Sequence, residues 1–394
     1  MSGLLSRLAP PPIVVDADLG WVLRAAFTGA GGAPPADPAR AVDLARRLGL
    51  SARIAARAQA VGEWEALRTA LGGELARSLA IEQAKAEAQA ASLTQLHAEV
   101  AAITERSGVG FAALKFAALA ATPGLALPGR SAADVDLLVE TAGIERLASA
   151  LREAGYRSSD IPGFEHQLPA LVHPRRGAVE LHTKIPGVRI GGRGWATYED
   201  LRREALLVET PAGQVPARDV LVAHALAHGL VQHVFAPRAY CLLQTFADLA
   251  DLGFAVEDSP LERFARFERL AGWLRRGLER EDLRATRDLV AALTSGAEVT
   301  SAAARRLLDH ALAGRLDPGY ESALRLADLR APLSDRPAVL ARGAAIRRAL
   351  LPSAAELAAI YGPAGGPLGR LGQRLRRPFD LVGRTWRALR RRPR

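Results

Sequence analysis

The first hundred residues place their apolar side chains three or four positions apart, which is the period of an amphipathic helix. This pattern predicts helices over residues 18–28, 38–57 and 64–106, the last as one or two long helices. Residues 1–12 end in three consecutive prolines and are expected to form a loose arm. We therefore expect an N-terminal helical region over residues 1–106, whose simplest role is packing and interaction.

After Gly108 the pattern changes to short β-prone runs. They are residues 109–114, 134–139, 167–172 and 178–183, with an amphipathic helix predicted over 141–154. The intervening segment 173–177 carries a proline and a glycine and predicts a hairpin turn, and a second small hairpin is expected over 206–216. Together these elements predict a small mixed α/β core over residues 107–216.

From residue 217 onward the helical period returns. Helices are predicted over residues 220–234, 240–252, 261–280, 283–294, 302–313, 320–329, 338–351 and 354–361. The chain of 394 residues exceeds the usual size of a single hydrophobic core, so several subdomains are expected. We predict an α+β fold in which a small mixed sheet is flanked by an N-terminal helical domain and by a C-terminal helical domain over 217–362.

The final segment, residues 363–394, differs from the rest in charge. Between Gly366 and Arg394 there are ten arginines and one aspartate, which accounts for nearly all of the formal net charge of +10. The remainder of the chain is almost neutral, so the basic character does not predict a nucleic-acid-binding body. We expect a solvated basic tail, and contact with an anionic membrane or with nucleic acid remains the alternative.

Cysteine content and hydropathy limit the class of protein. Cys241 is the single cysteine, which excludes an intrachain disulfide and any metal site built from several cysteines. We find no signal-peptide pattern and no run of about 18 apolar residues long enough to span a membrane. The expectation is a cytoplasmic protein, with peripheral membrane association through the tail as an alternative.

Two acids interrupt the apolar strand predicted over residues 134–139. Successive side chains of a strand point to opposite faces, so Asp134 and Asp136 share one face. Like charges held so close call for a raised pKa or a bound cation, and Mg²⁺ uses one or two protein carboxylates together with substrate phosphates. The pair therefore suggests phosphate chemistry, although two solvated acids at a strand end would give the same pattern.

A third acid lies on another predicted strand, where Glu180 and His182 share a face. If the two strands are neighbours, Glu180 would lie beside the aspartates and complete a three-acid site of the kind used in two-metal nucleotidyl transfer. The alternative for Glu180 is an exposed position on an edge strand.

These residues resemble a known group of proteins. The matching elements, in chain order, are Leu114-Lys115, Arg130, Asp134-Val135-Asp136-Leu137-Leu138-Val139 and Glu180-Leu181-His182. In this order they are similar to an uncharacterised bacterial nucleotidyltransferase family of the DNA polymerase beta-like superfamily, over roughly residues 105 to 252. The chain departs from the family pattern at Phe116, where the family has a glycine that would let backbone amides approach a triphosphate.

The resemblance implies an enzyme that moves a nucleoside monophosphate from an NTP, with ATP as the first expectation, to an unknown small-molecule or protein acceptor. It implies Mg²⁺ or Mn²⁺ held by Asp134, Asp136 and Glu180, which would also be the catalytic residues. Lys115 and Arg130 would contact phosphates and His182 the nucleotide. The alternative for Lys115 is a surface side chain with no role in the site. The alternative for Arg130 is a charged residue of a surface loop. A non-catalytic nucleotide- or metal-binding relative, or a helical scaffold docked through its tail, are the alternative functions.

A histidine cluster follows in the C-terminal half. His224 and His228 lie four positions apart and share a helix face, with His233 close behind. Asp248 and Asp251 on the next predicted helix could complete a second metal site or line an acceptor site. Histidines that serve structure or line the substrate are the simpler interpretation.

Overall fold

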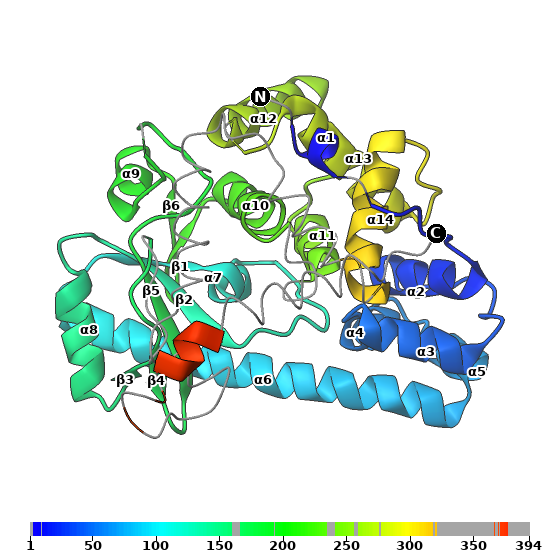
Figure 1. The fold of residues 1–394 in the computed structure, drawn as a ribbon, viewed down its shortest axis with the longest axis horizontal. Helices are drawn as coiled ribbons and strands as arrows, with labels where there is room; N and C mark the ends of the chain where they lie inside the picture. The colour runs from blue at the N-terminus through cyan, green and yellow to red at the C-terminus, as the bar shows by residue number, and fades with distance from the viewer. Residues whose placement is uncertain are drawn as a thin grey trace. The chain divides into compact units, whose positions relative to one another are not determined.

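The computed structural model describes residues 3–8, 10–159, 166–192, 194–234, 241–255, 259–275, 277–317, 320, 366, 369 and 371–376. The chain divides into two units, one ending at Leu316 and the other running from Asp317 to Arg394. The first unit contains a five-stranded sheet, a two-stranded ribbon and helices before and after them (Figure 1). The predicted α+β fold class is confirmed.

The N-terminal helices largely follow the apolar periodicity. They are α1 (Leu4–Arg7), α2 (Ala17–Thr28), α3 (Pro38–Arg47), α4 (Ser51–Ala60), α5 (Trp64–Leu71) and α6 (Gly73–Arg106). The prediction of one helix over residues 38–57 was wrong, because Gly49 adopts a φ of +70° and breaks it in two. The stretch from residue 64 to 106 forms two helices, as one of the predicted options had it.

The first residues do not form a loose arm over the part that the structure describes. Leu4, Leu5 and Leu8 are buried, and the backbone amides of Leu4 and Leu5 donate hydrogen bonds to the Asp282 carboxylate at 3.0 and 2.9 Å. The expectation failed because the partner of these amides lies far away in the sequence, on another helix.

The sheet is mixed. Its strands are β1 (Phe111–Leu114), β2 (Asp134–Val139), β3 (Arg157–Ser158), β4 (Leu171–His173) and β5 (Gly177–His182), in the order β1-β2-β5-β4-β3. Strands β2 and β5 run parallel, whereas the other neighbours are antiparallel. The predicted hairpin between β4 and β5 is confirmed, and so is the ribbon of β6 (Leu207–Thr210) and β7 (Gly213–Pro216). Helices α7 (Lys115–Ala121), α8 (Ile144–Glu153) and α9 (Tyr198–Arg203) complete this region.

One long helix joins the N-terminal helices to the sheet. Helix α6 has 34 residues and packs against α4 and α5 as well as against β2 and α8 (Figure 1). At 1.5 Å per residue it extends roughly 50 Å. Leu79 near its start and Val100 near its end are both fully buried, so a single apolar cluster continues along the helix.

The C-terminal helices of the first unit are α10 (Arg218–Leu226), α11 (Leu242–Asp251), α12 (Pro260–Leu274), α13 (Arg280–Ser295) and α14 (Ala302–Leu316). The helix predicted over 220–234 is not uniform, because residues Ala227–Gln232 form a π-helical turn, η1. A Cβ atom on Gly229 would lie 2.4 Å from Oγ1 of Thr245, so this glycine lets η1 approach α11 closely.

Several expectations fall on other parts of the chain. The helices predicted over 320–329, 338–351 and 354–361, and most of the basic tail, lie outside the described residues. Among the helices that are described, none is both long and apolar enough to cross a membrane.

Candidate functional site

The parallel pairing of β2 with β5 brings acids from two strands together. The register places Asp136 opposite Glu180 and Leu138 opposite His182. Because side chains alternate along a strand, Asp134 and Asp136 of β2 share a face with Glu180 and His182 of β5. The two strands are neighbours, as the sequence predicted.

Three of these side chains form a tight group. The ligand atoms of Asp136, Glu180 and His182 all lie within 4.8 Å of one another. His182 Nε2 is 2.8 Å from Oδ1 of Asp136 and 3.5 Å from Oε2 of Glu180. Asp134 is not a member of this group, although it occupies the same strand face. The imidazole thus takes a place in the cluster that the sequence assigned to a second aspartate.

Lys115 contacts the same acids from the end of β1. Its Nζ is 2.7 Å from Oδ1 of Asp136 and 3.8 Å from Oε2 of Glu180. Strand β1 turns directly into helix α7 at this residue, which adopts a φ of +45°, a conformation that favours glycine. The strained residue of this turn is therefore the one whose ammonium reaches the acids.

The surroundings shift the pKa values of Asp136 and Asp134 in opposite directions. Burial alone would raise the pKa of Asp136, but Lys115 and His182 outweigh it, and the pKa lies well below its usual range. The pKa of Asp134 is raised to about 6 by burial and by the charge of Asp136. Burial works against a charge on His182, yet its hydrogen bonds to Asp136 and Glu180 raise the pKa of the imidazole.

The donor set fits a divalent cation. Among the described residues the Asp134 carboxylate makes no hydrogen bond or ion pair, and burial together with the negative charge of Asp136 raises its pKa despite the nearby Lys115. A bound cation would relieve this charge, and carboxylate oxygens are the ligands that Mg²⁺ and Mn²⁺ prefer. The residues present are therefore suited to hold such an ion.

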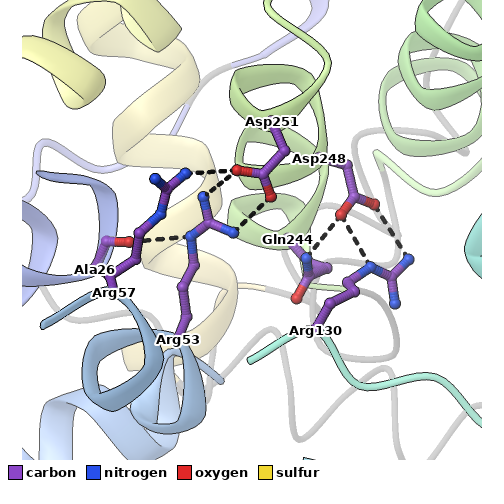
Figure 2. Close-up of polar contacts among 7 residues, drawn as sticks. All are labelled: Ala26, Arg53, Arg57, Arg130, Gln244, Asp248 and Asp251. Atoms are coloured by element: carbon purple, nitrogen blue, oxygen red, sulfur yellow. Dashed lines mark hydrogen bonds and ion pairs between the residues drawn. The ribbon is translucent and has the colours of Figure 1, made fainter. Parts of the chain in front are cut away.

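Arg130, predicted to contact phosphate, is engaged by an acid of α11. Its Nε and Nη2 lie 2.9 and 3.1 Å from the two carboxylate oxygens of Asp248, and Gln244 donates to Asp248 Oδ1 at 2.9 Å (Figure 2). The guanidinium also lies 6.0 Å from the ring centre of Phe116, the residue that replaces the expected glycine. A contact of Arg130 with phosphate stays a prediction.

A cavity of about 650 Å³ lies beside the aspartates of β2. Lys115, Asp134 and Asp136 line it on the side of the sheet, and His224, His228 and His233 line it from α10, η1 and the residue after them. Its size is within the range typical of small-molecule sites. The predicted histidine cluster and the two aspartates of the predicted acid site thus line one cavity, whereas Glu180 is not among its lining residues.

The three histidines are uncharged at neutral pH. Burial and the nearby Lys115 lower the pKa of His224 to about 3 and depress the pKa values of His228 and His233. The ring centres of His228 and His233 are 4.5 Å apart. In the described part of the chain these histidines do not bring three ligand atoms within 4.8 Å of one another, so a second metal there stays a prediction.

Comparison with known proteins identifies the family. A family model described as uncharacterised nucleotidyltransferase matches residues 34–261, more than half of the chain. The chain belongs to this family. No curated protein and no solved structure matches it.

The family match is wider than the resemblance seen in the sequence. It begins before α3 and ends at the start of α12, so the nucleotidyltransferase family unit includes helices α3 to α6 as well as the sheet. All the acids of the site and the histidine cluster lie within it, whereas α13 and α14 lie beyond it.

Asp251 does not join the site. It accepts from Arg53 at 2.8 and 2.9 Å and from Arg57 at 2.6 Å, while Arg53 Nε donates to the carbonyl of Ala26 at 3.0 Å (Figure 2). The suggested role beside the histidines was wrong for this acid, because these arginines of α4 occupy its carboxylate.

Two residues near the site carry no signal in the sequence. His166 stacks on His182 with 5.8 Å between ring centres, and burial together with the nearby His182 lowers its pKa to about 4. Arg315, near the end of α14, lines the cavity. Neither belongs to a recognisable motif, so only the folded arrangement reveals them.

Proposed function

We propose that this protein transfers a nucleoside monophosphate from an NTP to an acceptor hydroxyl or similar nucleophile, with release of pyrophosphate and with a divalent metal ion. The pairing of Asp136 with Glu180 across parallel strands, next to a 650 Å³ cavity that Asp134 and Asp136 line, carries the proposal. Membership of a nucleotidyltransferase family supports the reaction class.

The carboxylates would hold the cation. Asp136 is kept ionised by Lys115 and His182, and Glu180 and Asp134 share its strand face. When bound, a divalent metal would neutralise phosphate charge and lower the pKa of the acceptor hydroxyl. Because His182 contacts both Asp136 and Glu180, we assign it to orienting these carboxylates rather than to direct contact with the nucleotide.

In the reaction the acceptor oxygen would attack the α-phosphorus, and the bond to the bridging oxygen of the β-phosphate would break. Glu180 is less buried than Asp136 and would accept the proton of the acceptor, directly or through water. Lys115, already among the acids, would contact the phosphates and offset charge on the departing pyrophosphate.

The test uses the full-length chain and Asp136→Asn. Calorimetry should detect Mg²⁺- or Mn²⁺-dependent binding of at least one NTP to the wild type, with ATP tried first, and little or no such binding to the variant. Pyrophosphate release is then followed with each NTP and a metabolite extract. The matched control is Asp43→Asn, which alters an exposed acid paired with Arg47 on α3. Equal Mg–NTP affinity in Asp136→Asn would overturn the proposal.

A non-catalytic relative is the second candidate, and one observation favours it. The Lys115 ammonium forms an ion pair with Asp136 and can neutralise the charge that would otherwise attract a metal ion. Metal-dependent NTP binding without pyrophosphate release, in every extract tried, would select this alternative. Docking of the basic tail on an anionic membrane or nucleic acid stays a prediction, since most of that segment lies outside the described residues.

A further inference from the structure

Arg315 brings a positive charge to the cavity from outside the family region. It lies in the last turn of α14, beyond the end of the family match at residue 261. The end of α14 lies close to the histidine wall, because Nε2 of the buried His310 contacts the carbonyl of Val234 at 2.7 Å. Val234 directly follows His233, which lines the same cavity.

The Arg315 guanidinium has an unmet hydrogen-bonding need. Its Nε is buried and has no hydrogen-bond partner among the described residues. Leaving a buried donor without an acceptor costs about 1–3 kcal/mol. A position near the C-terminus of a helix suits a cation electrostatically, but it supplies no acceptor for this donor.

The other positively charged side chains that line the cavity are paired with acids. Lys115 is ion-paired with Asp136, and Arg130 with Asp248. The lining histidines are neutral because their pKa values are lowered. Among the described lining residues, Arg315 is therefore the cation without an acidic partner, and it shares the cavity with uncharged hydrogen-bonding imidazoles.

This position suits an acceptor better than the NTP. Binding of an NTP is what a nucleotidyltransferase family shares, so the residues for it are expected within the matched region. A residue outside that region can differ between members and can select their acceptors. A guanidinium recognises carboxylates and phosphates through paired hydrogen bonds.

We propose that Arg315 binds the anionic group of the acceptor, and that the acceptor is a small hydroxyl compound that carries a carboxylate or a phosphate. The inference rests on the proposed nucleotidyl transfer. The neutral histidines that line the same cavity would hydrogen-bond the hydroxyl groups of such a molecule without repelling it.

The test measures binding of chosen probes to the full-length chain. Glycerol 3-phosphate and glycerate are the anionic probes, and glycerol is their neutral match. Arg315→Gln should weaken binding of at least one anionic probe by about tenfold or more, the scale of a charge-assisted hydrogen bond. Arg315→Lys should recover part of the loss. Arg305→Gln changes an arginine of the same helix that does not line the cavity, and it should bind like the wild type.

Binding of Mg–ATP to the same proteins separates this inference from the proposed function. It should change less than about threefold in Arg315→Gln if the residue serves the acceptor. A loss of Mg–ATP affinity equal to the loss for the probes would assign Arg315 to the triphosphate and overturn the inference. Undiminished probe binding in Arg315→Gln, or no binding of anions to the wild type at millimolar concentration, would also overturn it. Failure of Mg–ATP to bind the wild type would instead count against the proposed function.

Discussion

The Nζ atom of Lys115 lies 2.7 Å from Oδ1 of Asp136, the most deeply buried acid of the site. An ammonium therefore occupies part of the space in which a metal ion would contact this carboxylate. The same group stabilises Asp136 in the ionised form that a metal requires.

Replacing Lys115 by Met should strengthen metal binding in the absence of nucleotide. The competing positive charge is removed, so calorimetry should show Mn²⁺ affinity raised by about tenfold, while pyrophosphate release slows. Lys85→Met is the control, because Lys85 forms an exposed pair with Glu82. Weaker or unchanged Mn²⁺ affinity in Lys115→Met would show that the ammonium does not compete with the metal.

Glu180→Gln should affect turnover more than NTP binding. The substitution keeps size and hydrogen bonding but removes the charge that would serve the attacking nucleophile, so kcat should fall on the order of 10² or more. NTP affinity should change only a few-fold. Steady-state kinetics together with calorimetry measure the two effects, and Glu209→Gln on the exposed face of β6 serves as the control. Turnover of Glu180→Gln at the wild-type rate would show that Glu180 has no catalytic role.

Asp251→Asn should destabilise the fold strongly. The side chains of Asp251 and Arg53 are 2% and 3% exposed, and loss of one charge leaves the other buried without its partner. Urea unfolding should show a loss of about 3 kcal/mol, against less than about 0.5 kcal/mol for Asp43→Asn in its exposed pair. Equal losses in the two variants would contradict the structural importance of the Arg53 contact.

The stability of the protein should fall in mild acid through His97. Burial lowers the pKa of this imidazole, whose Nε2 has no hydrogen-bond partner among the described residues. The unfolded chain takes up a proton near pH 6.5, whereas the folded chain resists it. The contribution of His97 is therefore complete above pH 6.5 and is lost as the pH falls towards the folded pKa. His97→Leu should show a shallower loss of unfolding free energy between pH 7 and 5, and parallel curves would refute the assignment.

Local pattern predicted much of the site. Alternation in β2 and β5 correctly placed Asp134 with Asp136 and Glu180 with His182, because period-two patterning is a property of each strand alone. The four-residue spacing of His224 and His228 likewise placed both on the cavity wall.

Contacts between distant segments were beyond the sequence. Arg130 and Asp248 are 118 positions apart, and nothing local to either residue indicates the other. The hydrogen bonds from the amides of Leu4 and Leu5 to Asp282 also join distant residues, so the sequence did not reveal that these first residues are held in place. Arg315 in the cavity depends on how α14 packs, so no motif could have revealed it.

Helix α11 carries two acids one turn apart that serve different segments. Asp248 engages Arg130, which lies shortly before β2 and the paired acids, and Asp251 engages Arg53 of α4. Helix α11 thus contacts both the helical N-terminal region and the loop that leads to the acids. A fragment that began at Ser107 would keep every acid of the site, yet it would leave Asp251 without either of its arginines. The smallest piece of this chain that can hold the site in shape therefore includes α4, although no residue of that helix lines the cavity.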